Sequence, residues 1–320
     1  MHGPYCCLPE RSRSMTLTRR SLFALAGVTT LAACSTSNPL SSPSSAAAPA
    51  SAGAPLVVGS QQYYSNEIVA ELYAQVLEKA GRKVTRQYQI GQREVYLPEI
   101  VSGKIDVFPE YNGNLLQYFN KTAKVTDSAS VQTALSTSLP SGLRVLTAAQ
   151  ASDQDTYTTT KALADQYGLA SLSDLKKLTG QKAITVAANS EFATRPYGPI
   201  GLKSVYGVDA TVIPVEDGGG PLTVKALVDG QAVLADIYSA SPSIAKNNLV
   251  ILSDPSSLIL PQNLVPLVSS KVDSAAETAI NAVSAKLTAS ELQKLNAQSV
   301  DDKLKSSAIA TTWLKAQGLL

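Results

Sequence analysis

The chain has few of the side chains that enzymes use for nucleophilic and metal chemistry. Its 320 residues include one histidine and three cysteines. His2, Cys6 and Cys7 all precede the first apolar segment, so a mature domain starting after that segment has Cys34 as its only cysteine and has no histidine. For that domain, Ser-His-Asp and Cys-His catalysis, His-ligated zinc, disulfides and cysteine-ligated metals are excluded. A hydrolase with two carboxylates stays open, although no acids are spaced for that work.

An excess of one charge is also missing. The chain has 27 Lys and Arg against 25 Asp and Glu, and residues 1–34 hold four of the basic residues and one of the acidic ones. The rest of the chain therefore has 23 basic and 24 acidic residues. A surface this balanced gives no attraction to nucleic acid or anionic lipid, so we expect no nucleic-acid partner.

The longest apolar run near the start of the chain is too short to span a bilayer. It extends from Leu22 to Ala33, about a dozen residues where about 20 are needed. A basic flank precedes it, which predicts a signal peptide over 1–33. The small residues before Cys34 resemble the lipobox of bacterial lipoproteins, so Cys34 would carry lipid and begin the mature chain. We expect an exported protein anchored to the outer face of a bacterial cell membrane.

The route of export stays open. Arg19 and Arg20 resemble a twin-arginine signal, but two arginines before an apolar run are equally compatible with ordinary export. Met15 is an alternative start, because residues 1–14 add nothing that a signal needs.

A segment without a core-forming composition follows. Residues 34–55 are almost entirely Ser, Ala, Pro, Thr and Gly after the cysteine, which predicts a flexible tether. Some 20 such residues have a root-mean-square reach of roughly 25 Å. The tether would hold a domain near a membrane without fixing its orientation.

From Leu56 onward the pattern is that of an α/β protein. Buried strands alternate with segments whose apolar residues recur at helical spacing, which predicts a mainly parallel sheet. About 265 folded residues are many for one core, so we expect two lobes. The expected strands are 56–60, 83–90, 105–111, 184–187, 211–215 and 233–238; the expected helices are 68–80, 94–102, 172–178, 198–206 and 221–228, with a mostly helical segment over 275–320.

Two distant stretches end in the same way. Gly103 and Gly230 each follow a predicted helix and suit a left-handed C-cap, and Tyr111 and Tyr238 each lie eight residues further on, near a strand end. Ligands of open α/β sheets collect outside the carboxyl ends of strands. We therefore expect a tyrosine at the ligand site in each half of the molecule, with Tyr157 as a third candidate near a crossover. Other tyrosines, such as Tyr73, Tyr88, Tyr118, Tyr167 and Tyr206, are expected to pack in the fold.

Motifs for phosphate or metal are weak. Gly218, Gly219 and Gly220 lack the P-loop Lys-Ser/Thr and the dinucleotide spacing, so they indicate a loop and a helix start. Asp153 and Asp155 lack the spacing of an EF-hand, and we expect neither metal nor cofactor. Arg195, just before a predicted helix, could hold a carboxylate through two hydrogen bonds.

A set of short motifs, in order along the chain, resembles the substrate-binding proteins of osmoprotectant ABC importers of the ProX/OpuC type. The resemblance covers essentially Leu56 to Leu320. Its motifs are Gly59-Ser60-Gln61, Ala70 to Ala74, Gly91 to Glu94, Gly103 to Asp106, Pro109 to Gly113, Phe192 to Pro196, Val205 to Gly207, Gly220 to Leu227, Leu249 to Asp254 and Val265-Pro266.

The resemblance implies a two-lobed periplasmic-binding-protein fold of type II. One lobe would comprise 56–152 and 263–320 and the other 153–262, joined by crossovers near 151–157 and 258–263. Such a protein captures a quaternary ammonium osmoprotectant, glycine betaine or a related betaine, and delivers it to an ABC permease without catalysing a reaction. We expect a monomer that touches the membrane only through its lipid.

The resemblance also implies the site residues. The family holds the ammonium group in a box of tyrosines, and each ring face contributes roughly 0.5 to 2 kcal/mol. The matching cage residues are Tyr111, Tyr157 and Tyr238, with Asp155 as the nearby acid; Arg195, Gln61 and Asn114 match the carboxylate contacts, and Gln262 stands where the family has a fourth tyrosine.

Alternatives differ in the ligand or in the class of protein. Gln262 leaves open a receptor for choline, or for a larger aromatic or polar solute. A carboxylate-based surface enzyme and a sensory or adhesive lipoprotein on the same fold are further possibilities.

Overall fold

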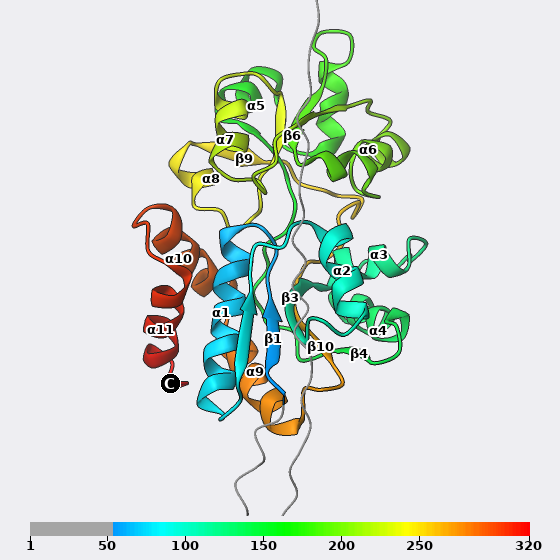
Figure 1. Ribbon diagram of the computed structural model, residues 1–320. Helices are drawn as coiled ribbons and strands as arrows, with labels where there is room; N and C mark the ends of the chain where they lie inside the picture. Colours follow the sequence, from blue (N-terminus) through cyan, green and yellow to red (C-terminus); the bar gives the residue numbers. More distant parts are fainter. Residues whose placement is uncertain (1–53) are drawn as a thin grey trace, which may run out of the picture. The chain divides into compact units, whose positions relative to one another are not determined.

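The computed structural model describes residues 54–320, which form two five-stranded sheets flanked by helices (Figure 1). The predicted signal peptide, Cys34 and nearly all of the tether lie outside the described residues. Among residues 54–320, no helix is both long enough and apolar enough to cross a membrane.

The first sheet has the strand order β2-β1-β3-β10-β4. Strand β1 pairs in parallel with β2 and β3, whereas β10 pairs antiparallel with β3 and β4. The sheet is therefore mixed, with β10 alone running against the other four. The strands are β1 (Leu56–Gly59), β2 (Val84–Gln87), β3 (Val107–Tyr111), β4 (Leu143–Val145) and β10 (Leu264–Ser269).

The second sheet repeats this layout in the order β7-β6-β8-β5-β9. Strand β6 pairs in parallel with β7 and β8, and β5 pairs antiparallel with β8 and β9. In both sheets the reversed strand follows directly on a connection from the other sheet. The strands are β5 (Tyr157–Thr160), β6 (Thr185–Ala188), β7 (Thr211–Pro214), β8 (Leu234–Asp236) and β9 (Leu249–Ile251).

Helices cover both sheets. With the first sheet lie α1 (Tyr64–Lys79), α2 (Arg93–Val101), α3 (Asn112–Phe119), α4 (Ser128–Ser138), α9 (Ser274–Lys286), α10 (Ala289–Val300) and α11 (Ser306–Ala316). With the second lie α5 (Lys161–Tyr167), η1 (Leu172–Leu178), η2 (Ser190–Thr194), α6 (Pro199–Tyr206), α7 (Pro221–Val228) and α8 (Ser243–Lys246), of which η1 and η2 are 3₁₀-helices. Helix α1 packs against the three C-terminal helices (Figure 1), so the end of the chain returns to its first folded segment.

Two connections join the sheets, one before β5 and one before β10. They pass side by side, and Ser152 and Asn263 form an isolated antiparallel bridge. We propose these connections as the boundaries of two lobes, a first lobe of 56–152 with 263–320 and a second lobe of 153–262.

Two glycines let the backbone approach closely near these connections. A Cβ on Gly113, at the start of α3, would lie 2.4 Å from the carbonyl oxygen of Pro261. A Cβ on Gly219 would lie 2.9 Å from the carbonyl oxygen of Asp236, and the φ of Gly219 is +71°. Larger side chains at these positions would push apart segments that border the cavity described next.

Candidate functional site

A small cavity lies at the carboxyl ends of strands from both sheets. Gln61 and Tyr63 follow β1, Tyr111 ends β3, Asn189 follows β6 and Tyr238 follows β8, and all five line the cavity. Gly103 and Gly230 have φ values of +76° and +74°, so the left-handed turns expected before β3 and β8 are present. The repeated helix, glycine, strand and tyrosine pattern therefore does bring both tyrosines to one place.

Four tyrosine rings and one phenylalanine form the aromatic part of the wall: Tyr63, Tyr111, Tyr197, Tyr238 and Phe192. Burial raises the pKa of all four tyrosine hydroxyls well above the usual range, so the phenols are neutral. Tyr111 is 2% exposed, and its hydroxyl has no hydrogen-bond partner among the described residues.

Carboxyl groups form the acidic part of the wall. Asp153, Asp155, Asp236 and Glu191 all line the cavity. Burial raises the pKa of Asp153 to about 6. Burial and the charge of Asp155 raise the pKa of Asp236 well above its usual range, and burial also raises that of Glu191. Asp153, Asp236 and Glu191 therefore ionise reluctantly in the cavity, and a bound cation would favour their charged forms.

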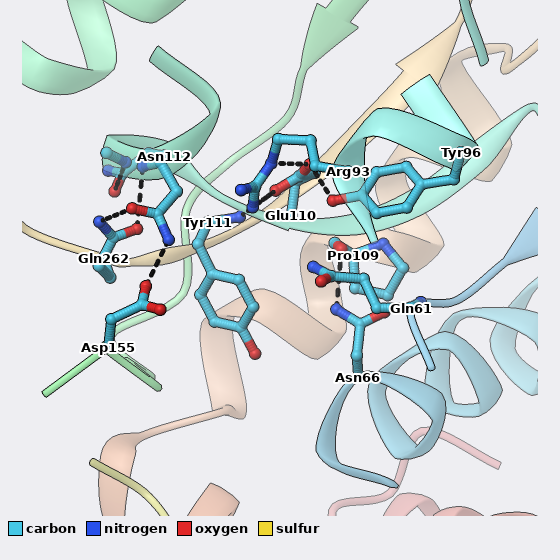
Figure 2. A network of polar contacts seen from close by, with 12 residues as sticks. Gln61, Asn66, Arg93, Tyr96, Pro109, Glu110, Tyr111, Asn112, Asp155 and Gln262 are labelled. Carbon is cyan, nitrogen blue, oxygen red and sulfur yellow. Dashed lines mark hydrogen bonds and ion pairs between the residues drawn. The ribbon is translucent and has the colours of Figure 1, made fainter. Parts of the chain in front are cut away.

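Arg93 lines the cavity but is already neutralised. Its Nε and Nη2 donate to the Oε1 and Oε2 of Glu110, both at 3.0 Å (Figure 2). Glu110 also accepts from the Tyr96 hydroxyl at 2.5 Å and from the Tyr111 amide at 2.9 Å. The pair is buried, with Glu110 0% exposed. Arg93 and Glu110 therefore fix the end of β3, from which Tyr111 projects.

Arg195 lines the same cavity and is also paired. Its Nη1 and Nη2 donate to the Oε1 and Oε2 of Glu94, at 2.7 and 3.0 Å. Arg195 follows η2 in the second lobe, and Glu94 lies in the first turn of α2 in the first lobe. This bidentate pair thus connects the two lobes across the cavity rim.

Asn114, Gln262 and Asp155 form a chain of hydrogen bonds. Gln262 Nε2 donates to Asn114 Oδ1 at 2.7 Å, and the backbone N–H of Asn114 donates to Gln262 Oε1 at 3.0 Å. Asn114 Nδ2 donates to Asp155 Oδ2 at 2.5 Å. Gln262 is 1% exposed and does not lie on the cavity wall among the described residues. It acts on the site only through Asn114, which holds Asp155.

Gln61 is positioned by its backbone. Its amide donates to Asn66 Oδ1 at 2.8 Å, and Asn66 Nδ2 donates to the carbonyl of Pro109 at 3.0 Å (Figure 2). Asn66 therefore ties the end of β1 to β3, and the Gln61 side chain is left on the cavity wall.

Tyr157 departs from the sequence prediction. It is 1% exposed, donates from its hydroxyl to the carbonyl of Tyr197 at 2.8 Å, and packs edge to face on Phe192 with centroids 5.6 Å apart. It begins β5 with its ring in the core of the second lobe, and it is not among the described residues on the cavity wall. Tyr197 takes the wall position instead. Tyr63 and Tyr197 were not expected, although Tyr63 lies only shortly after the end of β1.

The glycine loop forms the start of α7, as the sequence predicts. Asp217 accepts from the amides of Gly220 at 3.2 Å and Leu222 at 2.6 Å, so the loop caps α7 with its own side chain. Within residues 54–320 no cluster of three or more His, Cys, Asp or Glu side chains could hold a metal ion. The acids do meet in space, however, and the sequence spacing did not indicate this.

Residues 54–316 match the family model described as the substrate binding domain of ABC-type glycine betaine transport system. The chain belongs to this family. It is 27% identical over 275 residues to the glycine betaine-binding protein YehZ of Escherichia coli, which covers 82% of this chain and 90% of that protein. The resemblance drawn from the sequence motifs is thereby confirmed.

Solved structures support the same fold. The apo structure of Escherichia coli YehZ is 26% identical and covers 83% of this chain and 99% of its own, with a TM-score of 0.59. A structure described as a glycine betaine/carnitine/choline ABC transporter is 22% identical with a TM-score of 0.66, and covers 82% of this chain and 99% of its own. The two-sheet fold of substrate-binding proteins is therefore confirmed, and the chain is an extracytoplasmic substrate-binding protein of an ABC importer.

Proposed function

We propose that this protein binds a quaternary ammonium compound, glycine betaine or a related betaine, in the cavity between the lobes and delivers it to an ABC permease. The observation that carries the proposal is one cavity whose wall combines four neutral tyrosine rings with four carboxyl groups. The relative YehZ is named as a glycine betaine-binding protein, which supports the same ligand class.

The wall suits a methylated ammonium group for a physical reason. Such a group cannot donate strong hydrogen bonds, so ring faces are its natural partners, at roughly 0.5 to 2 kcal/mol each. The candidate cage is Tyr63, Tyr111, Tyr197 and Tyr238, and Tyr157 supports it from behind through Tyr197. Asp155 adds a negative charge within the same cavity.

A ligand carboxylate would have the three partners that the family resemblance implies. Arg195, Gln61 and Asn114 all line the cavity. Arg195 offers two parallel N–H groups, the geometry that carboxylates prefer. Gln262 has the indirect role of holding Asn114.

Choline is a second candidate, favoured by a specific observation. Within residues 54–320, both arginines on the cavity wall are paired with glutamates, whereas four carboxyl groups line the same wall. This balance suits a cation that carries no carboxylate.

The remaining parts of the proposal rest on the sequence motifs and on the family resemblance. We propose that Cys34 carries lipid, that the protein acts as a monomer, and that the ligand passes unchanged to the permease. Asp155 and Asp236 lie together, as a carboxylate-based enzyme would need. Release of an altered product from a bound ligand would revive the enzyme alternative.

The experiment is isothermal titration with glycine betaine, proline betaine, carnitine and choline in one series. We expect stoichiometric binding of at least one of them by the wild-type protein, and a weaker signal from Tyr238→Ala. Tyr167→Ala, a tyrosine of the second lobe outside the cavity wall, is the matched control. Heat from none of the four ligands would overturn the proposal and point to a different aromatic or polar solute.

A further inference from the structure

The pair of Arg195 and Glu94 separates two cavities. Beside the inner cavity lies an outer one, and both are lined by Arg93, Asn114, Arg195 and Tyr197. Glu94 lines only the outer cavity. Glu94 therefore pairs with Arg195 from the outer cavity, and Arg195 also borders the inner cavity.

The contact has the geometry of a bound carboxylate. The two N···O distances of 2.7 and 3.0 Å are those of a bidentate clamp. The Arg195 side chain is 11% exposed, whereas that of Glu94 is 50% exposed. A half-exposed carboxylate gains little from one ion pair, so another carboxylate can replace it.

Among the described residues, Arg93 is the only other cationic side chain on the wall of the inner cavity. Arg93 is bound to Glu110, which is fully buried and also accepts from Tyr96 and Tyr111. If a ligand carboxylate replaced Glu110 on Arg93, the buried charge of Glu110 would lose its partner, which is costly. A carboxylated ligand therefore depends on Arg195, and must take it from Glu94.

We propose that Glu94 is a built-in competitor for the ligand's carboxylate and sets the selectivity between betaines and choline. This inference rests on the proposed function. A betaine displaces Glu94 from Arg195 into the outer cavity. Lys121 lies on the wall of that cavity and can pair with the displaced carboxylate. Choline has no carboxylate and leaves the pair of Arg195 and Glu94 in place.

The test is Glu94→Gln, which keeps the size of the side chain and removes its charge. Binding of glycine betaine and of choline is measured by titration for both proteins. We expect affinity for glycine betaine to rise about two- to fivefold, the value of an exposed ion pair, while affinity for choline changes by less than about twofold. Retained choline binding also shows that the variant is folded.

Glu99→Gln is the matched control. Glu99 lies on the same helix and pairs with Lys104 at 2.8 Å, away from both cavities. The control should alter neither affinity, so an equal gain there would reveal a general effect of net charge and overturn the inference. An unchanged ratio of the two affinities in Glu94→Gln, or an equal loss for both ligands, would also overturn it. If the wild-type protein binds none of the four compounds in the titration series, the proposed function fails first and the inference with it.

Discussion

Tyr63 and Tyr238 meet edge to face, with ring centroids 4.9 Å apart and planes inclined by 62°. Tyr63 follows β1 of the first sheet and Tyr238 follows β8 of the second, so the contact joins the two lobes. Aromatic pairs of this kind contribute about 0.5 to 1.5 kcal/mol beyond the area they bury. Both rings line the cavity, so the aromatic wall is complete only when the lobes are together. A ligand that binds both rings would therefore stabilise the closed arrangement.

The first prediction separates Tyr157 from Tyr197. Tyr157→Phe removes a buried hydrogen bond to the Tyr197 carbonyl, so we expect a loss of unfolding free energy of about 1 kcal/mol and little change in ligand affinity. Tyr197→Ala removes a ring from the wall and should weaken binding of glycine betaine and choline alike, by about 2- to 30-fold. Denaturant unfolding and titration measure the two effects. A greater loss of ligand affinity in Tyr157→Phe than in Tyr197→Ala would show that Tyr157 contributes to the cage.

A second prediction concerns Gln262. Gln262→Ala leaves the amide and side-chain oxygen of Asn114 without partners, which should cost about 1 to 3 kcal/mol of unfolding free energy. It should also weaken ligand binding, because Asn114 then holds Asp155 less firmly. Gln132→Ala, on α4, is a control of the same chemistry away from the cavity. Lost stability with full affinity would show that Gln262 has no effect on the site.

The third prediction is a dependence of binding on pH. In the unliganded protein the pKa of Asp153 is about 6 and that of Asp236 is raised, in each case first by burial. A permanent cation favours the ionised carboxylates, so binding should release protons, and affinity for choline should rise severalfold between pH 5 and 7. Titration in two buffers of different ionisation enthalpy counts the protons. Affinity that falls over this range would contradict the assignment.

The same groups affect stability without ligand. Because the folded-state pKa of Asp153 lies above its ordinary value of 3.8, the folded protein holds this proton more tightly than the unfolded chain. Its contribution to stability is therefore present at low pH and is lost as the pH rises through about 6. Asp153→Asn should flatten this part of the stability profile, and an unaltered profile would count against a buried, protonated Asp153.

A fourth prediction concerns the pair of Arg93 and Glu110. Glu110→Gln leaves a buried guanidinium without its counter-charge and should lower the unfolding free energy by about 3 to 5 kcal/mol. Glu99→Gln, at an exposed pair on the same helix as Arg93, should cost at most about 1 kcal/mol. Equal, small effects in denaturant unfolding would show that the buried pair does not hold the end of β3.

The positions of Tyr111 and Tyr238 could be predicted because they depend on local signals. A left-handed glycine after a helix, a short apolar strand and a following tyrosine are all readable from neighbouring residues. The same holds for α7, whose start at Pro221 and end at Val228 match the predicted bounds.

Strand β10 could not be predicted in this way. Pro266 normally argues against an interior strand, yet β10 lies between β3 and β4. In the register Pro266 lies opposite Pro109, and its carbonyl accepts from the Leu146 amide at 2.9 Å. The two prolines are far apart in sequence and meet only in the folded sheet, so a local pattern does not contain this pairing.

The acidic wall and the exchange of Tyr157 for Tyr197 depend on tertiary structure in the same way. Asp155 and Asp236 are far apart in sequence and meet because β5 pairs antiparallel with β8, which places Tyr157 opposite Asp236. Tyr157 and Tyr197 differ in which way their rings face from the second lobe, and the sequence pattern around them does not specify this.

The most direct test is a crystal structure of the protein with glycine betaine or choline bound. The account predicts the trimethylammonium group in the cavity lined by Tyr63, Tyr111, Tyr197 and Tyr238, within about 6 Å of several ring centroids. With glycine betaine, it also predicts a carboxylate on Arg195. A ligand bound elsewhere, or an ammonium group out of reach of these rings, would contradict the account.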